Sequence, residues 1–304
     1  MALVLVVNAG STSLKLAVVD EDGEARQVDG FEAAGVEAVG HRVVHGGPRF
    51  REAALLDDDV VAAIEELRPL APLHNAPALA AIRDAQRGLP DVPHVAVFDT
   101  AFHATLPPAA STYAVPARWR EEWGVRRYGF HGINVSWVAS QVRVARLCVC
   151  HLGGGCSVTA VLDGSSVDTT MGLTPLEGVP MATRAGSVDP GALFYLQREH
   201  GLTFEELDRA LEHDAGLAAL GGLDEPLGFE VYTYRIACAV GAAAVALGGL
   251  EAIAFTAGVG ENRPDVRDAI ASRVAFLGAA VHVVPAREEL VIAREARRVL
   301  ARAA

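Results

Sequence analysis

Residues 8–15, NAGSTSLK, contain the single lysine of a 304-residue chain that has 26 lysines and arginines in total. The ammonium group of Lys15 is a compact point charge on a flexible stem, whereas a guanidinium is a wide planar fork. Beside small hydroxyl residues and a glycine, such a point charge suits a phosphate group that lies close to the backbone. Apolar runs at residues 3–7 and 14–19 predict a strand–turn–strand with Gly10 in the turn. The alternative is an ordinary hairpin whose polar turn contains a lysine by chance.

Two isolated arginines and one acid lie in segments whose composition suits an anionic substrate. Arg42 lies in GHRVVHGG at residues 40–47, and a guanidinium there could hold a carboxylate or phosphoryl group through two hydrogen bonds. The alternative for this segment is a solvated loop. Arg184 is similarly isolated, within MATRAG. Asp99 directly follows the apolar run VAVF, and α/β active sites collect their residues at the ends of such strands.

Two histidines are bordered by turn-forming residues. His131 lies in RRYGFHG, between glycines and beside aromatic residues. His74 lies in PLHNAP, where the prolines predict a turn, and a histidine in such a turn is more often structural than catalytic. The sequence contains neither a GxxxxGK[ST] phosphate loop nor a GxGxxG dinucleotide motif after a strand. A nucleotide site of either kind is therefore excluded.

The composition excludes further classes of protein. Hydrophobic residues make up 51% and charged residues 21%, which is typical of a globular chain with one large or two ordinary domains. The formal net charge of −12, with no basic stripe, argues against a nucleic-acid partner. The longest apolar stretch, residues 236–260, is broken by Glu251 and by glycines. It predicts a buried helix followed by a core strand and not a membrane span.

The N-terminal segment and the cysteines indicate the cellular compartment. The opening MALVLVVNAG has no basic region before its apolar run, so we expect no signal peptide. The four cysteines show no ligand-spaced pairs, which favours reduced thiols over a metal site or a disulfide. We therefore expect a cytoplasmic protein without a membrane partner.

A weak internal repeat relates residues 3–20 to residues 147–164. Each copy predicts a strand, a polar turn with glycine, a second strand and a second turn, which suggests two similar α/β domains that face a common cleft. A third strand leads into the turn TAGVGEN at residues 256–262. Helices are predicted between these units, at residues 57–67, after Asp189, after the capping box of Thr203 and Glu206, and at residues 285–304.

Taken in order, these motifs resemble the acetate kinase family. The match runs through NAGSTSLK, GHRVVHGG, APLHN, VAVFDTAFH, RRYGFHG, CHLGGGCSVTAV, SVDTTMGLTPLEG, FTAGVGEN and PAREELVIARE, and it spans essentially the whole chain. The resemblance implies an α/β fold with two ribonuclease-H-like domains of the acetate kinase, sugar kinase and actin superfamily. We expect the N-terminal domain at residues 1–99 plus 289–304 and the C-terminal domain, with the nucleotide-binding loops, at residues 100–288.

The resemblance also implies an activity. We expect a reversible, ATP-dependent phosphorylation of acetate to acetyl phosphate and ADP, with Mg²⁺ or Mn²⁺ as the metal. The carboxylate attacks the γ-phosphorus directly, so no covalent nucleophile is needed. The expected protein is a homodimer, although the residues themselves do not fix the oligomeric state.

The family's functional positions carry over residue by residue. The residues that organise the metal are matched by Asn8 and Glu288. The groups that act on the carboxylate and the phosphoryl group in flight are matched by Arg42, Asp99, His131 and Arg184. The acyl pocket and its supporting histidine are matched by Arg42, Val44, Leu73, His74, Phe130 and Pro175. The nucleotide contacts are matched by Ser11, Ser13, Lys15, His151, Gly153, Gly154, Gly155, Gly258, Gly260 and Asn262.

The chain departs from the family at several places. It is shorter than typical members, and Ile133 follows the FHG motif where the family usually has threonine. Gly154 stands where the family usually has asparagine. Residues 220–230 contain no arginine, although the family carries an Asp-x-Arg contact to adenosine there. These differences bear on nucleotide affinity and base selectivity more than on phosphoryl transfer.

Two alternatives remain open at this stage. Propionate or butyrate is the rival substrate, since one methylene in an apolar pocket changes binding by only ~1–3 kcal/mol. A degenerate paralogue would instead bind a ligand or a partner without turnover. The presence of both arginines together with Asp99 favours an active enzyme.

Overall fold

The computed structural model describes residues 3–10, 14–31 and 35–303, apart from the side chains of residues 72 and 73. Contacts divide the chain into two compact units. The first consists of Met1–Ala104, Phe130–Trp137 and Arg287–Ala304, and the second of Thr105–Gly129 and Val138–Ala286. The division into domains at residues 99 and 288 stays a prediction. The contact-based units differ from it chiefly because residues 130–137 pack with the first unit.

The first unit is built on a six-stranded mixed sheet with the order β3-β2-β1-β4-β6-β5. β1 pairs antiparallel with β2, whereas β1, β4 and β6 are mutually parallel. The two strands predicted at the N-terminus are therefore present, whereas residues 11–13, in the expected turn, lie outside the described residues. The strands are β1 (Leu3–Ala9), β2 (Leu14–Val19), β3 (Ala25–Gln27), β4 (Val36–Val43), β5 (Ala54–Leu55) and β6 (His94–Phe98).

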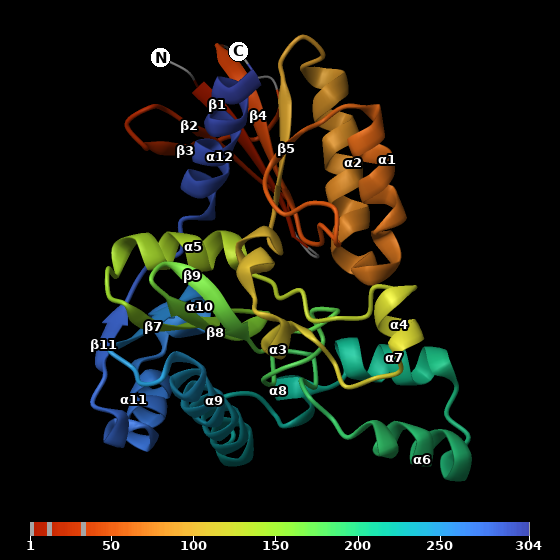
Figure 1. Ribbon diagram of the computed structural model, residues 1–304, viewed down its shortest axis with the longest axis vertical. Helices are drawn as coiled ribbons and strands as arrows, with labels where there is room; N and C mark the ends of the chain where they lie inside the picture. Colours follow the sequence, from red (N-terminus) through yellow and green to blue (C-terminus); the bar gives the residue numbers. More distant parts are fainter. Residues whose placement is uncertain (1–2, 11–13, 32–34, 304) are drawn as a thin grey trace. The chain divides into compact units, whose positions relative to one another are not determined.

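Helices cover both faces of this sheet (Figure 1). α12 (Glu288–Ala303) packs on the face formed by Val4, Val6 and their neighbours in the ladder. α2 (Pro72–Gly88) packs on the opposite face with Leu5 and Val7, and α1 (Asp58–Glu66) lies beside α2. Alternate residues of β1 thus enter two separate cores, as the period of two in a strand requires.

The turn expected around His74 is wrong. Residues 72–77 form the beginning of α2, and Asn75 donates its amide to the carbonyl oxygen of Ala71 at 2.8 Å. Pro72 is tolerated at the start because the first amides of a helix have no intrahelical acceptor. By contrast, the helix expected at residues 57–67 is confirmed as α1, and the side chain of Asp57 caps it by accepting from the amide of Val60.

The second unit repeats the topology of the first. Its five-stranded sheet has the order β11-β10-β7-β8-β9, with β7 and β8 antiparallel and β7, β10 and β11 parallel. The predicted internal repeat is thus confirmed as a repeat of structure, because β7 and β8 correspond to β1 and β2. The strands are β7 (Arg146–Leu152), β8 (Cys156–Leu162), β9 (Ser165–Thr169), β10 (Ala252–Thr256) and β11 (Ala280–Val283).

The long helix α9 (Pro226–Leu247) covers β7, β8 and β9 and packs against α11 (Pro264–Arg273). Among the described residues, α9 is the one helix whose length and apolar composition would allow it to cross a membrane. It buries Tyr232, Ile236 and Val240 completely, as expected for a core helix. The remaining helices are α3 (Pro108–Ser111), α4 (Ala117–Glu121), α5 (Gly132–Gln141), α6 (Pro190–His200), α7 (Phe204–His213), α8 (Gly216–Ala219), α10 (Ala257–Asn262) and the 3₁₀ turns Arg68–Leu70, Ala101–Thr105 and Ala275–Leu277.

The close approach of α12 to β4 gives a testable prediction. A methyl group at Gly40 of β4 would lie 2.7 Å from Cγ2 of Ile292, so we expect Gly40→Ala to lower the free energy of unfolding by about 1–3 kcal/mol. Urea denaturation followed by circular dichroism measures this change. Gly241→Ala in α9 is the matched control, because a methyl group there meets nothing within 4 Å. Equal stability of the Gly40 variant and the wild type would contradict the packing described.

Candidate active site

The carboxyl ends of the parallel strands in the first unit bring together an arginine and an acid. Arg42, next to the last residue of β4, donates from Nη2 and Nε to Oδ2 of Asp99 at 2.6 and 3.0 Å. Asp99 directly follows β6 and is fully buried, whereas Arg42 keeps 14% of its side chain exposed. The backbone amide of Asp99 also donates to the carbonyl oxygen of Val43 at 3.0 Å, which extends the pairing of β4 and β6 to the site.

Asn8 and Glu288 join the same network. Arg42 Nη1 donates to Oδ1 of Asn8 at 3.2 Å, and Nδ2 of Asn8 donates to Oε2 of Glu288 at 2.8 Å. Asn8 lies near the end of β1, and Glu288 is the first residue of α12. Lys15 is paired with Asn8 across β1 and β2, so the two side chains lie on the same face of the sheet.

Burial and charge set the protonation of the central pair. Burial raises the pKa of the Asp99 carboxyl group, Arg42 opposes this shift, and the charge of Glu288 adds to it, so that the pKa lies above its ordinary value. Burial lowers the pKa of Arg42, but the charges of Asp99 and Glu288 raise it above its ordinary value. The guanidinium therefore stays charged. Removal of either partner from such a buried pair typically costs about 3–5 kcal/mol.

The start of α5 fixes His131 beside Asp99. Gly132 donates its amide to the carbonyl oxygen of Asp99 at 3.0 Å, and a Cβ on this glycine would overlap that oxygen. His131 adopts a left-handed backbone with φ of 60° just before the helix begins, and it is largely buried. A non-glycine residue held in this region is commonly found at functional sites.

Three residues that the sequence analysis did not assign hold Phe130 and its surroundings. His103 Nε2 lies 2.9 Å from the carbonyl oxygen of Phe130, and the ring of His45 meets the ring of Phe130 edge to face at 5.3 Å. Asn75 is bonded twice to the backbone of His45, through Oδ1 and through Nδ2. Both histidines belong to motifs quoted above. Their contacts are to a backbone carbonyl and to an aromatic ring, and no spacing of residues in the sequence predicts such contacts.

In the second unit, Arg184 is held in a loop by several partners. Its Nη1 donates to the carbonyl oxygen of Pro175 at 2.9 Å and lies 3.5 Å from Sδ of Met181. Nε lies 3.8 Å from Oε2 of Glu212, at the end of α7. Burial lowers the pKa of Arg184 below its ordinary value, and the charge of Glu212 offsets only part of that shift. Nη2 makes no hydrogen bond within the described residues.

The glycine segments expected to bind nucleotide lie at the carboxyl ends of β7 and β10. His151 of β7 is paired with Thr256 of β10, and a Cβ on Gly153 would lie in ordinary contact with Ala257, at 3.5 Å. The carbonyl oxygen of Gly154 accepts from the amide of Ala182, which joins this turn to the loop of Arg184.

The segment expected as a third glycine turn, residues 256–262, is instead a short helix. α10 follows β10 directly, and Ala257 takes a left-handed φ of 66° at the junction. Within α10, Asn262 donates to the carbonyl oxygen of Gly258 at 2.8 Å, and Arg267 of α11 donates to that of Gly260 at 3.0 Å. The turn prediction failed because β10 passes into the helix without an intervening loop.

Other predicted site residues have these positions. Ser11 and Ser13 lie outside the described residues, as does the side chain of Leu73. His74 is half-buried in the first turns of α2, and Val44 is buried just after β4. The catalytic and binding roles of all these residues stay predictions.

Comparison with known proteins identifies the family. Residues 27–301 match the Acetokinase family. The chain belongs to this family. It is 42% identical to the acetate kinase of Thermotoga maritima over 316 aligned positions, which cover 87% of this chain and 78% of that protein. It is 44% identical to the acetate kinase of Deinococcus deserti, with 88% and 79% covered.

Solved structures agree with this assignment. A propionate kinase from Francisella tularensis is 31% identical, with a TM-score of 0.91 over 98% of this chain and 100% of that one. The acetate kinase of Porphyromonas gingivalis is 29% identical, with a TM-score of 0.85 over 99% and 100%. The predicted fold class is therefore confirmed, and the chain is a kinase of the acetate and propionate kinase kind.

The buried histidine behind Phe130 predicts how acid affects stability. Burial lowers the pKa of His103 to about 4, from about 6.5 in the unfolded chain, so the unfolded state takes up the proton first. The stability that His103 contributes is present above about pH 6.5 and is lost as the pH falls toward 4. Between pH 7.5 and pH 5.0, we expect His103→Gln to lose about 2 kcal/mol less stability than the wild type.

Urea denaturation of both proteins at the two pH values measures this difference. His200→Gln, at the exposed end of α6, is the control and should lose as much as the wild type. A His103 variant that also follows the wild type would show that this imidazole is not held neutral.

Proposed function

We propose that this chain transfers the γ-phosphoryl group of ATP to acetate, giving acetyl phosphate and ADP, and that it catalyses the reverse reaction as well. The observation that carries the proposal is the buried pair of Arg42 and Asp99, bonded to Asn8 and Glu288 at the carboxyl edge of the first sheet. A degenerate binding protein would not need to keep a charged guanidinium and a buried acid together. The relatives named acetate kinase support the choice of substrate.

The proposed mechanism is a direct in-line transfer. Such a transfer passes through a loose transition state, so positioning and charge stabilisation account for most of the catalysis. Arg42 and Arg184 would neutralise the carboxylate and the equatorial oxygens of the phosphoryl group, and His131 would donate a hydrogen bond to it. Asp99 holds Arg42 in orientation through two hydrogen bonds to one oxygen.

The side chains present fit a magnesium or manganese ion. Asn8 and Glu288 offer oxygen atoms of the kind that these ions prefer, and Oδ1 of Asp99 is buried without a hydrogen-bond partner within the described residues. No group of three or more histidine, cysteine, aspartate or glutamate side chains gathers as a metal site in the described part of the chain. Asn8 and Glu288 would hold the ion, and when bound it would neutralise phosphate charge.

Propionate is the second candidate substrate. The structural relative from Francisella tularensis carries the name propionate kinase, and the candidate acyl wall here consists of the buried residues Val44 and Phe130. An apolar wall discriminates between chains that differ by one methylene by only ~1–3 kcal/mol. We therefore propose acetate as the main substrate, with propionate accepted at lower efficiency.

We also propose a cytoplasmic homodimer with no nucleic-acid or membrane partner. The net charge of −12 argues against a nucleic-acid partner, and the absence of ligand-spaced cysteine pairs in the sequence favours reduced thiols, whereas the homodimer follows from the family resemblance alone. The domain boundaries at residues 99 and 288 belong to the same proposal.

The deciding experiment traps acyl phosphate with hydroxylamine. Purified protein with ATP and Mg²⁺ is offered acetate, propionate and butyrate in parallel, and ATP formation from acetyl phosphate and ADP is measured in reverse. We expect acetate to give the highest kcat/KM. Protein that binds ATP but forms no acyl phosphate, and no ATP in reverse, would establish the degenerate alternative.

We predict that Arg42→Ala and Arg184→Ala each lower kcat at least ~100-fold, because charge stabilisation of the phosphoryl group is lost. Steady-state kinetics measures the loss, and circular dichroism shows whether each variant is folded. Arg68→Ala is the control, since this arginine pairs with Glu65 on the surface and should keep kcat within about twofold. Near-normal turnover in a folded Arg42 or Arg184 variant would mean that the arginine is structural.

Base selectivity should be weak. Residues 220–230 contain no arginine, and Asp224 in this segment is paired with Arg263 at 3.1 Å. A pocket discriminates strongly between bases only when the wrong base leaves one of its buried polar groups without a hydrogen bond. Because this segment offers no arginine for such a contact, we expect kcat/KM for ATP, GTP and ITP to agree within roughly tenfold. Kinetics with the three nucleotides tests this. Strong ATP selectivity would show that another side chain contacts the base.

A further inference from the structure

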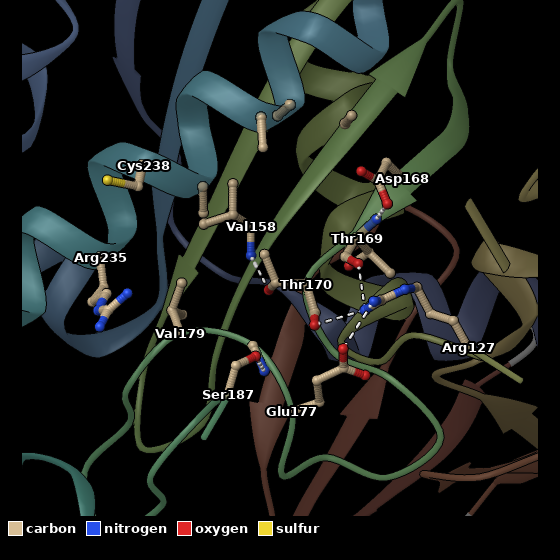
Figure 2. A pocket seen from close by; sticks show the side chains of 15 residues that line it. Arg127, Val158, Asp168, Thr169, Thr170, Glu177, Val179, Ser187, Arg235 and Cys238 are labelled. Carbon is tan, nitrogen blue, oxygen red and sulfur yellow. Dashed lines mark hydrogen bonds and ion pairs between the residues drawn. The ribbon is translucent and has the colours of Figure 1, made fainter. Parts of the chain in front are cut away.

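In the second unit, the segment from Thr169, the last residue of β9, to Glu177 is held by one arginine from outside it. Nη1 of Arg127 lies 3.0, 2.8 and 3.1 Å from the carbonyl oxygens of Thr169, Thr170 and Met171. Nη2 donates to Oε1 of Glu177 at 2.9 Å, and Figure 2 shows the guanidinium between the backbone and this carboxylate. A single side chain therefore bonds both ends of the segment.

The carboxylate of Glu177 is fixed a second time. The hydroxyl of Tyr113 donates to Oε2 of Glu177 and accepts from the amide of Leu173 at 3.2 Å, while Arg127 lies over the Tyr113 ring at 5.6 Å. Burial and the hydrogen bond to Glu177 raise the pKa of Tyr113, so its hydroxyl stays protonated as a donor. A Cβ on Gly172 would overlap both the carboxylate and this hydroxyl, so the segment is packed without spare room.

The clamped segment carries a partner of Arg184. Pro175 lies between the bonded ends, and its carbonyl oxygen accepts the hydrogen bond from Nη1 of Arg184. The loop of Arg184 begins where the segment ends, because Gly178 and Ser187 exchange two hydrogen bonds, at 2.8 and 3.2 Å. A shift of the clamped segment would therefore move both the base of the loop and the carbonyl that orients the guanidinium.

We propose that Arg127 is a positioning residue for Arg184 and acts on the reaction only through it. The proposal rests on the proposed function, since Arg184 is taken to stabilise the phosphoryl group in flight. An arginine suits this geometry better than a lysine, because its planar fork of five donors bonds three carbonyl oxygens and a carboxylate at once. A misplacement of about 1 Å at a reacting centre can lower the rate a hundredfold, so a contact remote from the substrate can still affect kcat.

The test is a double-mutant cycle on the whole protein. We expect Arg127→Met to lower kcat about tenfold or more with a smaller change in KM, and Arg127→Lys to restore part of the loss. In an Arg184→Ala background, Arg127→Met should change kcat by less than about twofold, because the residue it positions is already gone. Multiplicative losses in the double variant would overturn the proposal and make Arg127 a purely structural residue.

Arg118→Met is the matched control. Arg118 belongs to the same stretch of the second unit and pairs with Glu122 at 2.9 Å, the same separation as between Arg127 and Glu177. The difference is exposure, since the Arg118 side chain is 66% exposed and the Arg127 side chain 16%. We expect Arg118→Met to keep kcat within about twofold.

A second measurement tests the clamp without turnover. Hydrogen exchange by mass spectrometry should show faster exchange over residues 169–187 in Arg127→Met, with residues 146–162 of β7 and β8 unchanged. Unaltered protection over residues 169–187 would overturn the clamp itself. If the wild type formed no acyl phosphate, the proposed function would fail, while this comparison would still decide whether Arg127 holds the segment.

Discussion

The buried ion pair of Arg42 and Asp99 is the constraint around which the first unit is arranged. Burying a charged pair is costly unless further polar groups contact it, and here Asn8 bonds Arg42 while the amide of Gly132, at the start of α5, bonds the backbone carbonyl of Asp99. β4 and β6 must therefore end side by side, and α5 must begin against Asp99. Gly132 has no side chain because that approach leaves no room for one.

The same strand arrangement places polar groups in both units. In each sheet an antiparallel pair is followed by two parallel strands, so three strands end at one edge. In the first unit that edge carries Asn8, Arg42 and Asp99. In the second it carries His151 and the start of α10, with the loop of Arg184 bonded to Gly154. The two units thus share one strand arrangement but carry different side chains at the corresponding edge.

Much of this was predictable from the sequence, because periodicity, caps and ordered motifs are local signals. The helix at residues 57–67, the capping box of Thr203 and the hairpin at β7 and β8 all appear as expected. The turn around His74 was wrong because Pro72 begins a helix as readily as it breaks one. The supporting roles of His103 and Arg127 could not be predicted from the sequence, because their partners are backbone carbonyls distant in the sequence.

The position of α12 in the chain has a consequence for biosynthesis. This helix fills one face of the first sheet with Ile292 and brings Glu288 to Asn8, yet it follows the whole of the second unit in the sequence. As the ribosome extends the chain, the second unit can close on its own residues while the first still exposes Val4 and Val97. The first unit therefore cannot complete this core, or bring Glu288 to Asn8, until α12 has emerged.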